Sequence, residues 1–441
     1  MTTNTSAEAI KLSDEAVRPL RTLDPAAPLD DLSWLDDVIG DARVVALGES
    51  AHYNHEFHLL RHRLLRYLVE RHGFNAYTMP SGFSEGWLVD DWVRGGEGNL
   101  DTVIAAGTTS LMASWSEVRA QLEWMRQHNR GATRPVGFYG VDLSGSTVSL
   151  LPSLDAVTAY FAQADPEFEV DASIRETAAI FSAPSAFSLN EAVTAYKELD
   201  PAKRDALTAG LAGLVTRLTG RRLDYLTRTS SEAYERALRS LHLTVALDAI
   251  PRAILRGDRQ EIMFLRDAAM ADTVEWVLRR EDRIVLAGHN GNLLRHPFAL
   301  PDMPPATPLG MHLVDRLGAD YRVIGTTFGT GQTVNPDNDF YTGNLFIELQ
   351  PPRPGSFDAL LNASHDDPFA VDLRRMSERD RTIIQSTSQQ RTGNMYLDVN
   401  PLEAFDAIIH IPYVTAAEPD TASLAQSPED VQKAFAQWMN R

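Results

Sequence analysis

The chain has 441 residues, of which 44% are hydrophobic and 23% are charged, and it contains no cysteine. A chain of this length and composition can bury a large core in one or two domains, and the absence of cysteine excludes disulfides and thiol chemistry. The 60 acidic residues outnumber the 41 basic residues and give a formal net charge of -19, which disfavours binding to nucleic acid and to anionic lipid.

The first 29 residues are polar and mixed in charge, and they do not resemble a targeting signal. Further along the chain, no apolar run approaches the roughly 20 residues that cross a bilayer. We therefore expect no membrane partner and a cytoplasmic location.

Short runs of β-forming residues alternate with helical periodicity and predict an α/β fold, in which a mainly parallel central sheet is flanked by helices. The predicted strands, in chain order, are 43–47, 74–79, 135–141, 283–287, 321–328, 344–349 and 405–411. Between them lies a long helical stretch, with strong helical patterns at 204–222 and 232–255. We expect residues 1–150 and 281–441 to form two parts of one α/β core, and residues 151–280 to form a helical insertion that serves as a lid or a subdomain.

The first predicted strand runs into Gly48-Glu49-Ser50-Ala51-His52, which presents a carboxylate and an imidazole three residues apart. Open α/β sheets bind ligands beyond the carboxyl ends of their strands, so Glu49 and His52 are candidate site residues. Ser50 superficially resembles the serine of a Gly-x-Ser-x-Gly elbow. A histidine occupies the closing glycine position, so we do not expect Ser50 to be a nucleophile.

A helix is predicted after this loop, and its apolar stripe carries Arg61 between leucines. An arginine on such a stripe needs a carboxylate or a bound anion, which makes Arg61 a candidate site residue. On the opposite side of the helix lie His55, His58 and His62. We expect these three histidines to be solvated rather than to bind a metal.

Three further predicted strands also end in polar residues. His289 follows the strand 283–287 and is flanked by glycines, and we expect it to lie on the same rim as His52. Ser81 follows 74–79 and Asp142 follows 135–141, and either residue has an alternative role as a helix cap or a turn former.

These residues resemble the erythromycin esterase family, whose members open macrolactone rings by hydrolysis. The resemblance covers most of the chain and rests on motifs in a common order: Gly48-Glu49-Ser50-Ala51-His52, Arg61, Phe138-Tyr139-Gly140-Val141-Asp142, Arg266-Asp267-Ala268-Ala269, Gly288-His289-Asn290 and Tyr321-Arg322-Val323-Ile324-Gly325. It implies a histidine general base that activates water without a covalent intermediate, and His52 matches that base.

Two positions depart from the family pattern. Typical members have a glutamate where this chain has Pro80, and a second histidine where it has Asn292. Proline has no carboxylate, and asparagine does not transfer protons near neutral pH.

The resulting interpretation assigns catalysis to four residues. His52 is the base, Glu49 orients it, Arg61 holds Glu49 or a substrate oxygen, and His289 donates a proton or stabilises developing charge. We expect hydrolysis of an ester or lactone in a bulky macrolide, polyketide or other secondary metabolite. Two alternatives stay open: a non-hydrolytic cyclase, acyltransferase or lyase of natural-product biosynthesis, and a non-catalytic protein that binds a hydrophobic ligand.

The expected partner is a small hydrophobic molecule. The candidate substrate-binding residues are Ser81, Phe83, Met112, Trp115, Asp142 and Asn292. We expect no cofactor and no metal, because the acidic and histidine residues are not at ligand spacings typical of a metal site.

Overall fold

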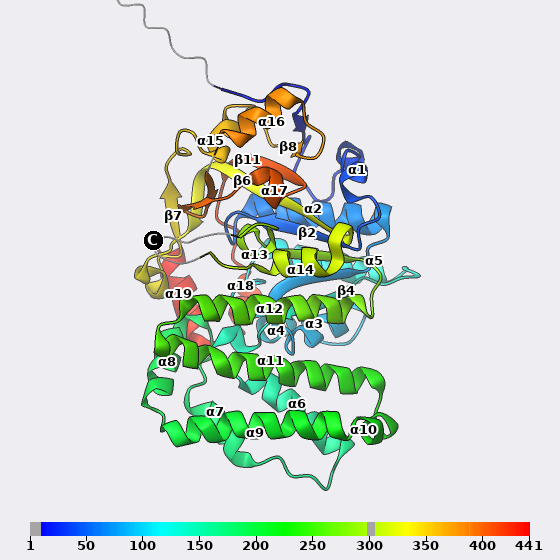
Figure 1. The fold of residues 1–441 in the computed structure, drawn as a ribbon, viewed down its shortest axis with the longest axis vertical. Helices are drawn as coiled ribbons and strands as arrows, with labels where there is room; N and C mark the ends of the chain where they lie inside the picture. The colour runs from blue at the N-terminus through cyan, green and yellow to red at the C-terminus, as the bar shows by residue number, and fades with distance from the viewer. Residues whose placement is uncertain (1–9, 298–304, 388) are drawn as a thin grey trace, which may run out of the picture. The chain divides into compact units, whose positions relative to one another are not determined.

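A computed structural model describes residues 10–297, 305–387 and 389–441. The chain divides into two compact units (Figure 1). Unit 1 comprises Met1–Phe74, Val285–Phe340 and Phe346–Ala417, and unit 2 comprises Asn75–Ile284, Tyr341–Leu345 and Glu418–Arg441. Each unit is therefore assembled from separate stretches of the sequence.

Unit 1 is built on a sheet whose strands follow the order β1-β8-β11-β6-β2-β5, with β7 paired to β6. The strands are β1 (Arg18–Pro19), β2 (Val44–Glu49), β5 (Ile284–His289), β6 (Tyr321–Val334), β7 (Phe346–Leu349), β8 (Phe369–Asp372) and β11 (Ala407–Val414). Strand β6 is parallel to β2 and β11, whereas β7, β8 and β1 are antiparallel to their neighbours. A separate hairpin joins β9 (Gln389–Thr392) to β10 (Met395–Asp398).

The helices of unit 1 lie between these strands in the sequence and pack against the sheet. They are α1 (Leu35–Ile39), α2 (His55–His72), α13 (Asn290–Leu293), α14 (Leu309–Leu317), α15 (Phe357–Asn362), α16 (Glu378–Gln385) and α17 (Pro401–Ala404). Every residue of β2 is buried, which is typical of a parallel strand covered on both faces.

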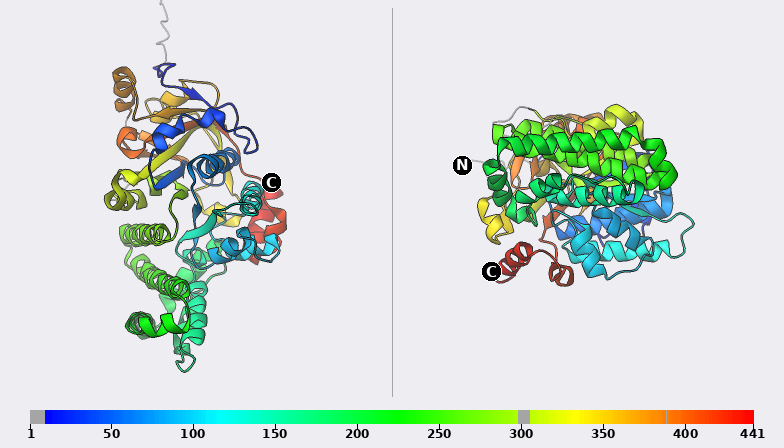
Figure 2. Two further views of the ribbon diagram at one scale, coloured as in Figure 1. Left: turned by 90° about the vertical axis from the view of Figure 1, so that its right-hand side faces the viewer. Right: turned by 90° about the horizontal axis from the view of Figure 1, so that it is seen from below.

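Unit 2 combines two parallel strands, β3 (Ala76–Gly82) and β4 (Gly137–Asp142), with a large set of helices. The helices before β4 are α3 (Gly86–Val93), α4 (Leu100–Gly107) and α5 (Ser116–Asn129). Those after it are α6 (Leu151–Ala164), α7 (Ala172–Ile180), α8 (Leu189–Glu198), α9 (Pro201–Gly220), α10 (Arg222–Arg228), α11 (Ser231–Arg256), α12 (Arg259–Leu278), α18 (Thr421–Leu424) and α19 (Glu429–Met439). Helices α9, α11 and α12 lie side by side, and the left view of Figure 2 shows them end-on.

The predicted α/β class with mainly parallel strands is confirmed. The seven predicted strands coincide with β2 to β7 and β11, although β3 runs on to Gly82 and β6 to Val334. The helical patterns at 204–222 and 232–255 correspond to α9 and α11. Helices α6 to α12 belong to unit 2 together with β3 and β4, so an insertion bounded at 151 and 280 stays a prediction.

One expectation about α2 is wrong. His58 and His62, which the helical wheel places on a solvated side, are only 3% and 6% exposed. His58 packs against the buried guanidinium of Arg61, whose Nη2 donates to His58 Nδ1. Farther round the helix, the segment before α1 contacts Arg63 and Arg66. The fully buried guanidinium of Arg63 donates to Pro28 O and Asp31 Oδ1, both at 2.6 Å, and Arg66 donates to Pro25 O.

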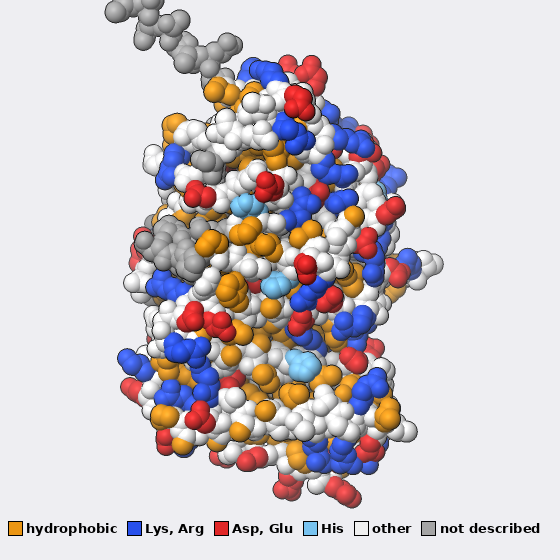
Figure 3. All heavy atoms as spheres, viewed as in Figure 1, with side chains coloured by type: hydrophobic (Ala, Val, Ile, Leu, Met, Phe, Trp, Pro, Cys, Tyr) orange, Lys and Arg blue, Asp and Glu red, His pale blue; other side chains and the backbone are white. Residues whose placement is uncertain are grey.

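Acidic and basic side chains are interspersed over the face shown in Figure 3, and neither sign is gathered into one large patch on that face. Among the described residues, none of the helices combines the length and the apolar character needed to cross a membrane.

Candidate functional site in unit 1

The candidate site begins where β2 ends. Glu49 is the last residue of that strand, and its Oε1 lies 2.7 Å from His52 Nδ1. A carboxylate only accepts hydrogen bonds, so Nδ1 carries the proton and donates it, which leaves the lone pair of a neutral His52 on Nε2. The His52 side chain is 35% exposed, so a substrate can reach that lone pair.

Arg61 of α2 completes an ion pair behind this histidine. Its Nη1 donates to Glu49 Oε2 at 2.8 Å, and both side chains are almost fully buried. Burial alone would raise the pKa of Glu49. The charge of Arg61 and the hydrogen bond from His52 outweigh that effect and lower the pKa to about 2. Glu49 is therefore ionised at neutral pH.

His58 is a member of this cluster that the sequence analysis missed. Its Nδ1 accepts a hydrogen bond from Arg61 Nη2, one helical turn away on α2. Burial, with the charge of Arg61, lowers the pKa of His58 to about 3, so the ring is neutral. The spacing of three residues from Arg61 was the available sequence signal. His58 acts as a positioning residue that fixes the guanidinium against Glu49.

His289 is the last residue of β5, and its ring lies beside that of His52. The ring centroids are 4.8 Å apart and the planes are inclined by 53°. The backbone N–H of Gly291 donates to His289 Nδ1 at 3.1 Å. Nδ1 is therefore the unprotonated nitrogen, and a neutral His289 carries its proton on Nε2. The two histidines thus have opposite tautomers, one suited to accept a proton and one suited to donate a hydrogen bond.

Asn290 fixes the loop that carries His289. Its side chain donates to Thr326 O at 2.7 Å and accepts from Thr326 N at 3.3 Å. A Cβ on Gly48 would lie 2.2 Å from Asn290 Oδ1, so the glycine allows this close approach of β2. The ends of β2 and β5 are tied in this way to the interior of β6.

Ser50 is fully buried in the same region. Its backbone N–H donates to Thr326 Oγ1 at 2.9 Å, and its hydroxyl lies 3.4 Å from the same oxygen. These contacts give Ser50 a structural role, and the expectation that it is not a nucleophile stays a prediction.

The backbone next to His52 is strained. Tyr53 has φ of 61°, a left-handed conformation that costs a bulky residue free energy. Its carbonyl accepts from Ala417 N at 2.9 Å, and the Asn54 side chain donates to Gln332 O and Thr415 O at 2.8 and 3.0 Å. These bonds hold the strained turn and so fix the orientation of His52. The sequence carried no signal for this.

The remaining candidate residues have structural surroundings of their own. Asn292 is half-buried on α13, directly after His289. In unit 2, the Asp142 carboxylate pairs with Arg266 Nε at 3.0 Å and accepts from Leu143 N at 2.8 Å. Ser81 is fully buried, and its hydroxyl accepts from Thr109 N at 2.8 Å.

Phe83, Met112 and Trp115 are 1%, 5% and 0% exposed and lie in the core of unit 2. Phe83 packs edge-on against Trp87 and Trp276, with ring centroids 5.1 Å away in both cases. The geometry gives these three residues a packing role, and their predicted role as a pocket wall stays a prediction without support from their surroundings.

Pro80 lies inside β3, at an irregularity of the β3–β4 pairing between Met79 and Gly82. A proline is tolerated at such a bulge because it has no N–H to pair. Within the described part of the chain, no three His, Asp or Glu side chains are grouped so as to hold a metal ion. The expectation that the reaction needs no metal stays a prediction.

Comparisons with known proteins point to one family. The family model described as erythromycin esterase matches residues 69–414. Erythromycin esterase type II from Escherichia coli is 28% identical, and the match covers 91% of this chain and 96% of the relative. Type I from Escherichia coli is 26% identical, with coverages of 92% and 98%. A solved structure of an EreC erythromycin esterase mutant in its open conformation has a TM-score of 0.74 at 24% identity, over 91% of this chain and 98% of that chain.

Proposed function

Because the chain belongs to the erythromycin esterase family, we propose that it hydrolyses an ester or lactone bond in a bulky macrolide, polyketide or other secondary metabolite, with His52 as the general base. Membership of the family makes the chain an enzyme of the esterase and hydrolase class. The names of the relatives make erythromycin the first substrate to test.

In the proposed reaction, His52 Nε2 removes a proton from a water molecule as the water oxygen attacks the carbonyl carbon. The electron pair of the carbonyl double bond moves to the carbonyl oxygen. When the tetrahedral intermediate collapses, the bond to the alcohol oxygen breaks and that oxygen takes the proton from His52 Nε2. Glu49 stabilises the imidazolium through its bond to Nδ1, at 2.7 Å.

His289 stabilises the negative charge that develops on the carbonyl oxygen. Its Nδ1 accepts from Gly291 N, so Nε2 carries a proton that it can donate in a hydrogen bond. A neutral imidazole is far too weak an acid to give up this proton outright. We therefore assign His289 a role in stabilising charge, rather than the proton donation that the sequence also allowed.

One observation carries this proposal: the rings of His52 and His289 lie side by side, with their centroids 4.8 Å apart. Their hydrogen bonds to Glu49 and to Gly291 N give the two rings opposite tautomers. Arg61 and Glu49 are positioning residues, since their charges are paired behind His52.

The test is turnover of erythromycin by the full chain and by His52→Gln. General-base catalysis contributes roughly 10²- to 10⁴-fold to rate, so kcat should fall by that factor while substrate still binds. His242→Gln is the matched control, because His242 is exposed on α11 and its replacement should leave kcat unchanged. Equal kcat in His52→Gln and wild type would contradict the proposal. Binding without turnover by the wild type would favour the non-catalytic alternative.

A second candidate is a non-hydrolytic reaction on the same base, with a substrate hydroxyl or an acidic C–H replacing water. Pro80 in β3 and Asn292 on α13 favour it, because neither supplies an ionisable group. Reaction in heavy-oxygen water separates the two candidates. One solvent oxygen in the product indicates hydrolysis, and an isomeric or dehydrated product without solvent oxygen indicates the second reaction.

A further inference from the structure

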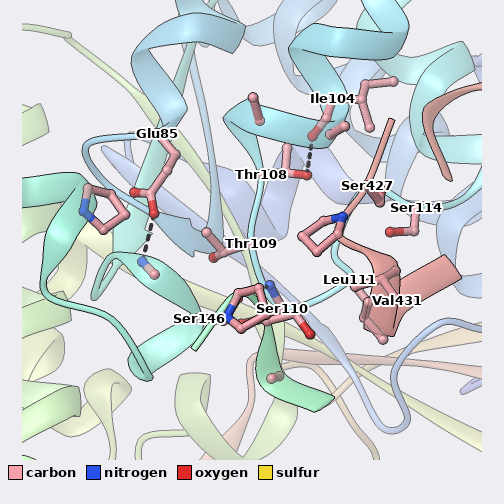
Figure 4. A pocket seen from close by; sticks show the side chains of 18 of the residues that line it. Glu85, Ile104, Thr108, Thr109, Ser110, Leu111, Ser114, Ser146, Ser427 and Val431 are labelled. Carbon is pink, nitrogen blue, oxygen red and sulfur yellow. Dashed lines mark hydrogen bonds between the residues drawn. The ribbon is translucent and has the colours of Figure 1, made fainter. Parts of the chain in front are cut away.

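Unit 2 contains a cavity of about 310 Å³ whose lining includes none of Glu49, His52, Arg61 and His289 (Figure 4). The residues that line it include Glu85, Ile104, Thr109, Leu111, Ser146 and Val431, and we call it the unit 2 cavity. Its volume is at the lower end of the range for ligand pockets, about 300 to 1,000 Å³, and suits a small molecule.

The wall of this cavity offers hydroxyl groups and one carboxylate. Serine and threonine residues alternate around it with apolar side chains, and Figure 4 shows Thr109, Ser110, Ser114 and Ser146 around the same space as Glu85. Among the described lining residues there is no Lys, Arg or His. The cavity therefore favours neutral or cationic ligands over anionic ones.

One of the two carboxylate oxygens of Glu85 has no hydrogen-bond partner among the described residues. Oε1 accepts from Gly145 N at 2.6 Å, and it is the buried Oε2 that lacks a partner among them. Gly82 makes room for this carboxylate, because a Cβ there would lie 2.3 Å from Oε2. Burial raises the pKa of Glu85, although hydrogen bonds from Gly145 N and the Ser144 side chain act in the other direction. A bound cation would offset the cost of ionising it.

Backbone strain is concentrated in two loops at this cavity. Of the five non-glycine residues with positive φ in the described chain, four are Ser110, Leu111, Ser146 and Thr147. The N–H of Ser110 donates to Ser146 Oγ at 3.0 Å and joins the two loops. Strain of this kind persists only where surrounding bonds hold it, and it gathers at ligand sites.

The opposite wall is also held in place. Ser185 and Ser188 both donate to Asp430 Oδ2, at 2.7 and 2.6 Å, and so anchor the segment that contributes Pro428 and Val431. The cavity is thus formed before any ligand arrives, and binding costs little ordering of the protein.

We propose that the unit 2 cavity binds a small primary amine that carries hydroxyl groups, with Glu85 receiving the ammonium group and the serine and threonine side chains of the wall receiving the hydroxyls. Its lining residues all belong to unit 2, whereas the residues of the hydrolytic site proposed above belong to unit 1.

Binding of D-glucosamine to the full chain, measured by calorimetry or ligand-observed NMR, tests the proposal. D-glucose has the same ring without the cation, and D-glucuronate has the opposite charge. We expect D-glucosamine to bind at least about tenfold more tightly than D-glucose, because a charge-assisted hydrogen bond contributes about twice as much as a neutral one. We expect no binding of D-glucuronate.

Two variants locate the site. Glu85→Gln keeps the oxygen that accepts from Gly145 N, and it should reduce the affinity for D-glucosamine about tenfold to that for D-glucose. Ala105→Phe, which fills the cavity from α4, should abolish binding. Glu167→Gln, at an exposed position, is the control and should bind as the wild type does.

The proposal is overturned if D-glucosamine does not bind, if D-glucuronate binds as well, or if either Glu85→Gln or Ala105→Phe binds D-glucosamine with wild-type affinity. None of these outcomes depends on turnover, so a failure here is distinguishable from a failure of the hydrolytic proposal.

Discussion

Glu49 keeps its charge in the interior because two partners share the cost of burial. Its side chain is 5% exposed, yet each oxygen accepts a hydrogen bond, one from His52 and one from Arg61. Replacing only one member of a buried ion pair leaves the other charge without compensation, which costs about 3 to 5 kcal/mol. The positioning of His52 is therefore coupled to the stability of unit 1.

This coupling predicts a pH dependence. The folded pKa of Glu49 is about 2, below the ordinary 4.5, so its contribution is complete above pH 4.5 and is lost as the pH falls towards 2. At pH 7, Glu49→Gln should lower the free energy of unfolding by about 3 kcal/mol, and the deficit should narrow at pH 3. Urea denaturation at both pH values measures this. Exposed Glu97→Gln should show no such change, and a deficit that stays constant would contradict the assignment.

Asp358 on α15 presents the opposite case. It is fully buried, its Oδ2 accepts from Arg391 N at 2.6 Å, and its Oδ1 has no hydrogen-bond partner among the described residues. Burial raises the pKa of Asp358 to about 7, although the Arg391 N–H and guanidinium act in the other direction. Ionising this carboxyl therefore destabilises the folded state.

The penalty is absent below pH 3.8, where the carboxyl is protonated in both the folded and the unfolded state. It grows between pH 3.8 and 7, where the unfolded state has lost the proton and the folded state still holds it, and it is constant above pH 7. Asp358→Asn should raise the free energy of unfolding at pH 8 by about 1 to 3 kcal/mol, after the cost of a buried amide. The gain should disappear at pH 4. Chemical denaturation measures both, with exposed Asp366→Asn as control. A gain of equal size at the two pH values would refute the raised pKa.

At the scale of elements, the packing of β2 against α13 depends on a glycine. Gly48→Ala should lower the free energy of unfolding by about 1 to 3 kcal/mol, because the new Cβ would meet an Asn290 side chain that two bonds to Thr326 hold in place. It should also lower kcat, because α13 begins directly after His289. Urea denaturation and turnover measure the two effects.

Gly213→Ala is the matched control. Gly213 lies inside α9 with nothing within 4 Å of the added Cβ, so alanine should stabilise the helix by about 0.5 to 1 kcal/mol. If Gly48→Ala were as stable as the wild type, the close approach of the two elements would have no energetic weight.

The strands that carry the site were predictable because each is a short, buried, apolar run that ends at a polar residue. This placed Glu49, His52 and His289 at strand ends, and the helical wheel of α2 placed Arg61 on its packed stripe. The wheel failed for His58 and His62 because it treats every side away from the apolar stripe as exposed to solvent, whereas both side chains are buried and His58 bonds to Arg61.

Other features were not accessible from local patterns. Strands β8 to β10 are four residues long, and their pairing depends on distant partners. The tautomers of His52 and His289 follow from hydrogen bonds to Glu49 and Gly291, and the left-handed Tyr53 follows from bonds to distant segments. Tertiary contacts, rather than propensity, determine each of these.

At the scale of the whole molecule, unit 2 depends on a distant stretch of chain. Helices α18 and α19 bring Leu424, Val431 and Phe435 into its core, and the Phe435 ring lies 5.3 Å from that of Trp115. The sequence between residues 75 and 284 therefore does not complete its own core.

Deletion of residues 418–441 should lower the stability of unit 2 by roughly 5 to 9 kcal/mol, because each fully buried large side chain contributes about 1.5 to 3 kcal/mol. Urea denaturation followed by tryptophan emission should show an earlier transition and a red shift as Trp115 meets water. Deletion of residues 440–441, both exposed, should change neither. An unchanged transition after the longer deletion would show that unit 2 is complete without it.

The register of β2 with β6 has a consequence for synthesis of the chain. Val44 pairs with Tyr321, so after Val44 the ribosome must add 277 more residues (321 minus 44) before Tyr321 is in place. At about 5 to 20 residues per second, the ribosome needs roughly 14 to 55 s to supply the second strand. During that interval the nascent apolar segment Val44–Leu47 has no β6 to pair with, which makes this stretch a natural target for chaperones that shield growing polypeptides.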